Sequence, residues 1–580
     1  MEYRYTTERN VQILLYLLKA YGIKKVVASP GTTNITLVAS MQQDPFFEMY
    51  SSVDERSAAY IACGIAAESG EPVVITCTGA TASRNYLPGL TEAYYRKLPV
   101  LAVTATQSVS KVGHLIPQVI DRSSMQKDVA VMSVLLQTVK DKEDENDCEI
   151  KANEAITALY RNGGGPVHIN IETTYSRDFS IRQLPETRII RRVSYEDPMP
   201  EIPEGRIGVF VGAHRPFTKA ESESIDKFCS TYDAVVFCDH TSNYKGKYRV
   251  LYSLVASQPK SYHRLTDIDL LIHIGEVSGE YATLGNLKAK KVWRISPDGE
   301  MRDTFKALDT VFCMSELFFF RNYGKTGISG NNIFIGECID TYNEIYSKIP
   351  ELPFSNIWIA KEMSKRLPEN SVLHLGILNT FRAWNFFEIP VSVMSFTNVG
   401  GFGIDGDVST AIGASLCNPT KLYFCILGDL AFFYDMNVVG NRHVGNNIRI
   451  LLINNGKGVE FRNYNHFGAM FGEESDKFIA AAGHYGNKSP MLIKHYADDL
   501  GYEYMAASSK EEFLTSIERF TTQEITSKPM LLEVFTETED ESNALKLIRD
   551  IETDGASTAK KMIKGILGEK LVKEIKSVIK

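Results

Sequence analysis

The stretch that decides the fold is "CILGDLAFFYDMN", Cys425–Asn437. An apolar run from Tyr423 to Leu427 ends at Gly428 and Asp429, and apolar and aromatic residues follow directly. A short apolar run that ends in turn residues is typical of a buried strand. Because a carboxylate at the end of a buried strand costs free energy unless it is neutralised, the sequence predicts a cation at Asp429.

A second polar turn follows the next apolar run, "RILLIN", which ends at Asn454, 25 residues after Asp429 (454 − 429). This separation fits one strand, helix, strand unit, whose parallel strands end at the same edge of the sheet. The turn continues as "NGKG" (455–458), so this edge offers carboxylate, amide and backbone carbonyl oxygens. Oxygen ligands suit Mg²⁺ together with phosphate oxygens, and glycines let the backbone approach a diphosphate. We therefore expect Asp429 to hold a magnesium ion that binds a diphosphate.

The same alternation of apolar strands and amphipathic helices occupies three segments of the chain. Continuous apolar strands of this kind are typical of parallel sheets covered by helices on both faces, with ligands at the carboxyl ends of the strands. The predicted fold class is α/β, with three domains that each hold a mainly parallel sheet flanked by helices. The predicted divisions are residues 1–185, 200–346 and 355–545, followed by a helical tail at 546–580.

Composition excludes several classes of function. The 580 residues are 44% hydrophobic and 23% charged, and the apolar runs are too short to cross a bilayer. A net charge of -8 argues against nucleic acid as a partner, so small ligands are expected. The nine cysteines include no C-x-x-C pair, which predicts neither a zinc site nor a disulfide framework. With no signal peptide in "MEYRYTTERN" (1–10), we expect a cytoplasmic protein.

The end of the chain differs from the rest. Residues 556–580 contain seven lysines and apolar residues at every fourth position from 563 to 579. This pattern predicts an amphipathic basic helix that packs on its own subunit or on a second one, and a membrane surface is the alternative.

The pairing of Gly428-Asp429 with Asn454-Asn455 resembles the cofactor motif of the thiamine-diphosphate-dependent pyruvate decarboxylase and acetolactate synthase superfamily. Leu430, where most members have glycine, is similar to the SEPHCHC synthases of menaquinone biosynthesis, which are carboligases. The resemblance implies thiamine diphosphate and Mg²⁺ as cofactors. It assigns as metal ligands Asp429, Asn455 and the backbone carbonyl of Lys457. It assigns to cofactor binding Pro30, Gly31, Asn85, Gly403, Ile404, Gly428, Asp429, Leu430, Ala431, Asn455 and Gly458. The alternative is a buried aspartate that only caps a helix.

Glu55 lies at the start of an apolar helical stretch, "SSVDERSAAYIACGIA" (51–66), where an acidic residue is ordinary. In this superfamily a glutamate in this setting bonds N1' of the cofactor's aminopyrimidine and thereby promotes loss of the thiazolium C2 proton. The resemblance also suggests His114 and Gln118 as catalytic residues near the cofactor. A lone histidine in "KVGHLIP" (111–117) is more often structural.

This chain differs from the SEPHCHC synthases at positions that the resemblance assigns to substrate binding. The resemblance covers residues 10–180 and 355–540, and the middle segment is similar only in architecture. Four positions that hold arginine in those synthases are uncharged here, namely Thr33, Gln107, Val399 and Leu416. Arg382 corresponds to one retained arginine. Because a guanidinium matches a carboxylate, these losses argue against that particular pair of polycarboxylate substrates. Glu460, Lys457 and Arg462 follow the metal loop and are further candidates for substrate contact.

We therefore expect a thiamine-diphosphate-dependent enzyme that decarboxylates a 2-oxo acid and transfers the acyl-anion equivalent to an unknown acceptor. The alternatives are a simple decarboxylase that releases an aldehyde and a non-catalytic binding module of the same fold. A nucleotide-dependent oxidoreductase is disfavoured because "GGFGIDG" (400–406) lacks the G-x-G-x-x-G spacing. No FAD is expected, since "VFVGAHRP" (209–216) is a weak glycine signal. The superfamily completes each site with Glu55 of one chain and Asp429 of another, which implies a homodimer or homotetramer.

Overall fold

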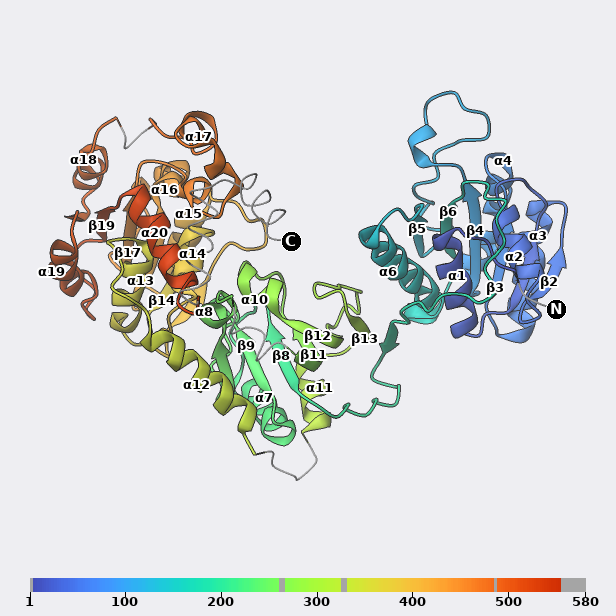
Figure 1. The fold of residues 1–580 in the computed structure, drawn as a ribbon, viewed down its shortest axis with the longest axis horizontal. Helices are drawn as coiled ribbons and strands as arrows, with labels where there is room; N and C mark the ends of the chain where they lie inside the picture. Colours follow the sequence, from blue (N-terminus) through green and yellow to red (C-terminus); the bar gives the residue numbers. More distant parts are fainter. Residues whose placement is uncertain (1–3, 260–266, 325–330, 485–487, 554–580) are drawn as a thin grey trace, which may run out of the picture. The chain divides into compact units, whose positions relative to one another are not determined.

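The computed structural model describes residues 4–259, 267–324, 331–484 and 488–553 (Figure 1). Contacts divide the chain into a first unit, Met1–Met199 with Asp298–Cys313, and a second unit, Pro200–Pro297 with Met314–Lys580. The predicted division into three domains stays a prediction. The basic helix predicted at 556–580 lies outside the described residues.

The first unit is built on a six-stranded parallel sheet in the order β2-β1-β3-β4-β6-β5. Its strands are β1 (Lys25–Ala28), β2 (Glu48–Ser51), β3 (Val73–Cys77), β4 (Val100–Thr106), β5 (Met132–Leu136) and β6 (Val167–Glu172). Its helices are α1 (Arg9–Ala20), α2 (Ile35–Gln42), α3 (Glu55–Ser69), α4 (Thr81–Asn85), α5 (Leu87–Tyr95) and α6 (Lys142–Ala158). A parallel pair, β7 (Arg191–Val193) with β13 (Leu308–Phe312), belongs to the same unit.

Both faces of this sheet are covered by helices. Val26 and Leu101 pack into one core with α1, α2 and α6, whereas their neighbours Val27 and Val100 pack into another core with α3 and α5. Figure 1 shows α1 and α6 together on one side of the sheet. Because successive strand residues face opposite sides, a sheet buried on both faces needs the continuous apolar runs found in the sequence.

A second parallel sheet, in the second unit, runs in the order β10-β9-β8-β11-β12. Its strands are β8 (Ile207–Val211), β9 (Val235–Cys238), β10 (Arg249–Leu251), β11 (Asp267–Ile274) and β12 (Lys288–Ile295). Its helices are α7 (Lys219–Tyr232), α8 (Ser253–Ala256), α10 (Tyr281–Asn286), α11 (Glu316–Tyr323) and α12 (Ile333–Ser347). Phe228 of α7 packs against Phe319 and Phe320 of α11, which closes one face of the sheet with aromatic contacts.

The third sheet has six parallel strands in the order β15-β14-β16-β17-β19-β18. Its strands are β14 (Val372–Leu375), β15 (Met394–Phe396), β16 (Tyr423–Gly428), β17 (Ile448–Asn454), β18 (Glu503–Ala507) and β19 (Met530–Phe535). Its helices are α13 (Asn356–Met363), α14 (Asn379–Trp384), α15 (Asp407–Cys417), α16 (Asp429–Asp435), α17 (Glu474–Phe478), α18 (Leu492–Asp499), α19 (Lys510–Phe520) and α20 (Thr538–Arg549). Helices α15, α16 and α18 share one core with alternate residues of β16 and β17.

The second and third sheets are joined by the buried His240. Its Nε2 lies 2.9 Å from the carbonyl oxygen of Trp384 and 3.0 Å from that of Phe387, and its backbone N–H donates to Asn385. Burial lowers the pKa of His240 to about 3, so the ring is neutral and its Nε2–H is the donor.

The predicted α/β class is confirmed, since all three sheets are parallel and flanked by helices. No helix within the described residues is long and apolar enough to cross a membrane. All nine cysteines are free thiols in this structure.

Gly212 follows β8 and lies against the backbone of Glu276, which follows β11 in the second sheet. A Cβ on Gly212 would lie 1.9 Å from the carbonyl oxygen of Glu276, so the backbone would have to move. We expect Gly212→Ala to lower the free energy of unfolding by about 1–3 kcal/mol in urea titrations. The matched control is Gly285→Ala in α10, where a Cβ meets nothing within 4 Å and alanine favours the helix. Equal effects of the two substitutions would contradict this account.

Candidate active site

The two predicted strand ends of the third sheet lie side by side. Strands β16 and β17 pair in parallel with Gly428 opposite Ile453, so Asp429 and Asn454 follow at the same edge. Asp429 begins α16 directly after the strand, which places its carboxyl group at a helix amino terminus. The strand, helix, strand unit expected from the sequence is therefore present.

Asp429 is buried, with 3% of its surface exposed. Burial raises the pKa of Asp429 to about 7, and the backbone N–H groups of Leu430 and Gly456 oppose this shift. Among the described residues no ion pair to Asp429 occurs. A cation at this edge would remove the cost of ionising the carboxyl group, as the sequence predicted.

Two consecutive asparagines at the end of β17 have different surroundings. Asn454 Nδ2 donates to Glu533 Oε1 at 2.7 Å, and Tyr504 donates to the other oxygen of Glu533 at 2.7 Å. The Oδ1 atom of Asn455 is buried and has no hydrogen-bond partner among the residues that the structure describes. An unpartnered amide oxygen beside a buried carboxylate could hold a divalent ion.

The glycine-rich turn after β17 is held by its side chains and backbone. Lys457 Nζ pairs with Asp476 at 2.8 Å, and Arg462 pairs with the other oxygen of Asp476. Gly458 donates to the carbonyl oxygen of Ala480 at 2.6 Å. Because the Lys457 ammonium group is engaged with Asp476, Lys457 could serve a metal through its carbonyl oxygen, as the resemblance suggests.

Four other predicted cofactor residues lie around this edge. Leu430 and Ala431 belong to α16, and Ala431 is buried in the core that α16 shares with the sheet. Ile404 is partly buried against the same core. A Cβ on Gly403 would lie 2.4 Å from the carboxylate of Asp405, so a side chain there would require that carboxylate to move.

Among the described residues no group of three or more His, Cys, Asp or Glu side chains could hold a metal ion. A site built from Asp429, an asparagine and a backbone carbonyl would not form such a group. Magnesium, which keeps several water or phosphate ligands, needs few protein ligands of this kind.

Glu55 and Asn85 come together in the first unit. Glu55 is the first residue of α3, and Asp54 caps that helix by accepting from the backbone N–H of Arg56. Asn85 Nδ2 donates to Glu55 Oε2 at 3.2 Å. The structure therefore pairs two predicted site residues that lie 30 positions apart in sequence.

The turn after β1 lies against the end of β3. A Cβ on Gly31 would lie 2.3 Å from Cβ of Thr78, so this position requires glycine. Pro30 is exposed beside it, and Thr33 donates to the carbonyl oxygen of Ala105 at 3.0 Å. This strand-end cluster could receive a ligand that enters at the carboxyl ends of β1, β3 and β4.

His114 and Gln118 lie in the loop between β4 and β5, and both are exposed. Gln118 has φ of 66°, and its carbonyl oxygen would lie 2.9 Å from a Cβ on Gly79. The backbone of Gln118 is thus placed over the end of β3. His114 makes one local contact, from its backbone N–H to the carbonyl oxygen of Lys111 at 3.2 Å.

None of the four positions noted for missing arginines offers a charge. Thr33 and Val399 are buried, Gln107 accepts from Lys111 at 2.7 Å, and half of the Leu416 side chain is exposed. Arg382, the retained arginine, pairs with Glu460 at 2.7 Å. Two of the candidates for substrate contact therefore neutralise each other.

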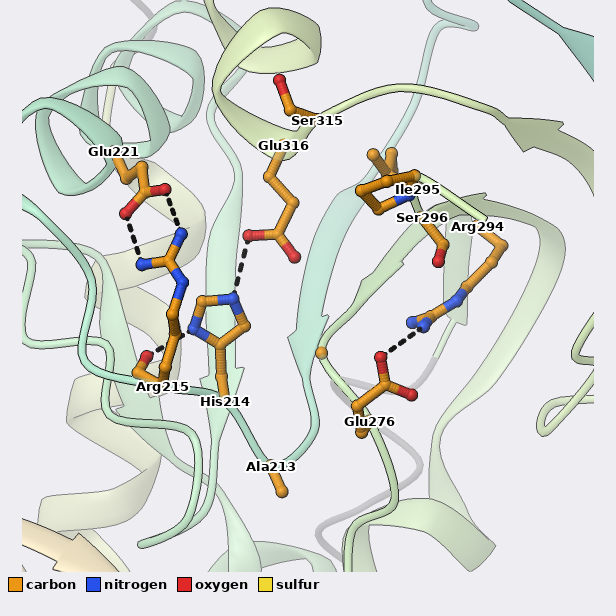
Figure 2. Close-up of a pocket in the computed structure, with 12 residues that line it drawn as sticks. Ala213, His214, Arg215, Glu221, Glu276, Arg294, Ile295, Ser296, Ser315 and Glu316 are labelled. Carbon is orange, nitrogen blue, oxygen red and sulfur yellow. Dashed lines mark hydrogen bonds and ion pairs between the residues drawn. The ribbon is translucent and has the colours of Figure 1, made fainter. Parts of the chain in front are cut away.

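A separate cavity of about 320 Å³ lies at the carboxyl ends of the second sheet, and Figure 2 shows its lining. Its polar side chains contact one another: His214 Nε2 lies 3.1 Å from Glu316, Arg215 pairs with Glu221, and Arg294 pairs with Glu276. No predicted site residue lines this cavity.

Sequence reasoning missed Glu533, the buried carboxylate that fixes Asn454. A signal for it exists, because Glu533 interrupts the apolar run "MLLEVF" of β19. Burial raises the pKa of Glu533, and its two hydrogen bonds oppose that shift.

Comparison with known proteins agrees with these features. Residues 9–126 match the family model of the thiamine pyrophosphate enzyme N-terminal TPP binding domain. The chain is 31% identical over 570 residues to a 2-succinyl-5-enolpyruvyl-6-hydroxy-3-cyclohexene-1-carboxylate synthase (SEPHCHC synthase) of Phocaeicola vulgatus, covering 93% of this chain and 98% of that protein. Proteins of the same name from Bacteroides fragilis and Flavobacterium johnsoniae are each 29% identical, over 93% and 92% of this chain and 98% and 97% of theirs.

The two asparagines give a test of the site in the protein without ligands. We expect Asn454→Ala to lower the free energy of unfolding by about 1–3 kcal/mol, because Glu533 loses a buried donor. Asn455→Ala should leave stability within about 0.5 kcal/mol, because its Oδ1 has no partner to lose. Denaturant unfolding of the apoprotein measures both, and a larger loss for Asn455→Ala would contradict the assignment.

Proposed function

The chain belongs to the family of thiamine pyrophosphate enzymes that includes the SEPHCHC synthases, and from this premise we propose that it decarboxylates a 2-oxo acid and transfers the acyl-anion equivalent to an acceptor. The observation that carries the proposal is the strand edge where the buried Asp429 lies near the unpartnered Oδ1 of Asn455. A carboxylate and an amide oxygen without a counter-ion suit a magnesium diphosphate.

The residues present fit the cofactor. Asp429, Asn455 and the carbonyl oxygen of Lys457 would hold Mg²⁺, and Gly428 and Gly458 would lie beside the diphosphate. Pro30, Gly31, Glu55 and Asn85 would receive the aminopyrimidine, with Gly403, Ile404, Leu430 and Ala431 around the rest. When bound, thiamine diphosphate supplies the electron sink that allows a 2-oxo acid to lose carbon dioxide.

Glu55 has the role of a proton-transfer partner in this proposal. Its Oε2 accepts from Asn85, which orients the carboxylate. A carboxylate held in this way can share a proton with a ring nitrogen of the cofactor and promote removal of a neighbouring proton. The exposed His114 and Gln118, in the loop beyond β4, are proposed to act on the substrate side.

Transfer to an acceptor is proposed over simple release of an aldehyde because the relatives named above are synthases. The uncharged side chains at Thr33, Gln107, Val399 and Leu416 argue against the pair of polycarboxylate substrates that the resemblance implies. Glu55 and Asp429 belong to different units, and we place the complete site between two copies of the chain, in a homodimer or homotetramer. The nine free cysteines favour a reducing cytoplasm.

Carbon dioxide release tests the reaction. A panel of 2-oxo acids should yield carbon dioxide in the presence of thiamine diphosphate and Mg²⁺, and Glu55→Gln should reduce the rate about 100- to 10,000-fold. Asp54→Asn, one residue away on the helix cap, is the matched control and should change the rate by less than about threefold. Release that persists in Glu55→Gln would refute the assigned role, and an aldehyde as sole product would favour the simple decarboxylase.

Metal removal tests the strand edge. We expect chelation with EDTA to abolish thiamine diphosphate binding measured by calorimetry, and added Mg²⁺ to restore it. Asp429→Asn and Asn455→Ala should each weaken binding at saturating Mg²⁺ by about tenfold or more. Asp499→Asn, an exposed aspartate at the end of α18, should leave binding unchanged. Binding without metal would contradict the proposed edge.

A further inference from the structure

Glu533 is a buried carboxylate without a counter-ion. It lies within β19, none of its surface is exposed, and it interrupts an otherwise apolar strand. Asn454 Nδ2 and the hydroxyl group of Tyr504 each donate to one of its oxygens at 2.7 Å. Burial raises the pKa of Glu533, and no positive charge of the described residues opposes that shift. A buried charge of this kind costs free energy, so its retention calls for a function.

The hydrogen bond to Asn454 does not by itself require a charge at this position. The amide oxygen of a glutamine could accept from Asn454 Nδ2 in the same way, without the cost of burying a carboxylate. Support of Asn454 therefore accounts for an acceptor at residue 533 and leaves the negative charge of Glu533 unexplained.

The strand register places Glu533 behind the edge that holds Asp429. Glu533 is opposite Leu452 of β17, and Leu452 is opposite Leu427 of β16, two positions before Asp429. Side chains that are opposite one another in neighbouring strands face the same side of a sheet. Leu427 and Leu452 belong to the core that α16 shares with the sheet. Glu533 therefore lies on the face that α16 covers, and α16 begins with Asp429.

The two buried carboxylates also interact through their charges. Burial is the main reason that the pKa of Asp429 is raised to about 7, and the charge of Glu533 raises it further. Like charges in one buried region repel each other, and a cation nearby stabilises both. The edge thus combines Asp429, which a metal could contact, with Glu533, whose two oxygens are already occupied by donors of the protein.

We propose that Glu533 supplies a second, non-ligating negative charge to the metal site, which strengthens the binding of a divalent cation and disfavours thiamine diphosphate that carries no metal. This inference rests on the proposed function. A negative charge behind the edge attracts the cation and repels the diphosphate, so its effects on the two ligands have opposite signs. A residue that only supported the fold would change both affinities in the same direction.

A pair of full-length variants separates the charge of Glu533 from its hydrogen bonds. Tyr504→Phe removes one donor and keeps the carboxylate. The double variant Tyr504→Phe with Glu533→Gln removes the charge, while the glutamine oxygen can still accept from Asn454 and its amide group faces no tyrosine donor. Glu503→Gln is the control for loss of a negative charge elsewhere on the sheet, because Glu503 begins β18 and pairs with Arg519 at 2.7 Å.

Mn²⁺ serves as the metal probe, and electron paramagnetic resonance measures the free ion with and without saturating thiamine diphosphate. Broadening of the phosphorus resonances of thiamine diphosphate in EDTA measures binding of the metal-free cofactor. We expect the double variant to bind Mn²⁺ about 10- to 100-fold more weakly than Tyr504→Phe, and the metal-free cofactor more tightly. Its thermal midpoint should not be lower than that of Tyr504→Phe, because a buried charge is removed. Glu503→Gln should match the unsubstituted protein in both titrations.

Three results would overturn the assignment: Mn²⁺ affinities of the double variant and Tyr504→Phe that agree within about threefold, a parallel loss of affinity for Mn²⁺ and for the metal-free cofactor, or no binding of Mn²⁺ to any of the proteins. Failure of the proposed function is a separate result. The unsubstituted protein would then release no carbon dioxide, while the dependence of Mn²⁺ binding on Glu533 would persist in the titrations without cofactor.

Discussion

The parallel pairing of β16 with β17 is the constraint on which the second unit's part of the site depends. Its register sets Asp429 and Asn454 at one edge, and every neighbouring contact follows from that placement. Glu533 of β19 fixes Asn454, while the turn beyond it is held by Asp476. A slip of one residue would exchange the β17 residues that face the two sides of the sheet and would displace Asn454 and Asn455 along the edge, so packing on both faces fixes the register.

Strands could be predicted from the sequence where they are buried and apolar. Strands β16 and β17 coincide with the apolar runs at 423–427 and 449–454, since burial on two faces favours apolar side chains along the whole strand. The edge strands β5 and β18 are only partly buried, so burial imposes a weaker apolar pattern on their sequences. Strand β6 is fully buried yet contains His168, Asn170 and Glu172, whose hydrogen bonds exist only in the assembled sheet.

The candidate site, too, could be predicted from the sequence only in part. Motif spacing predicted the pairing of strand ends, and the structure adds the hydrogen bond between Asn85 and Glu55. Spacing could not predict which charges neutralise each other, because Arg382 finds Glu460 from 78 positions away. Such properties belong to the fold and cannot be read from a local pattern.

The two consecutive asparagines at the end of β17, Asn454 and Asn455, have different roles. Asn454 is bound within the protein, and Asn455 keeps a free oxygen for the proposed metal. Metal binding at Asn455 would therefore leave the hydrogen bond between Asn454 and Glu533 intact, so the proposed site could be loaded or emptied without breaking that contact.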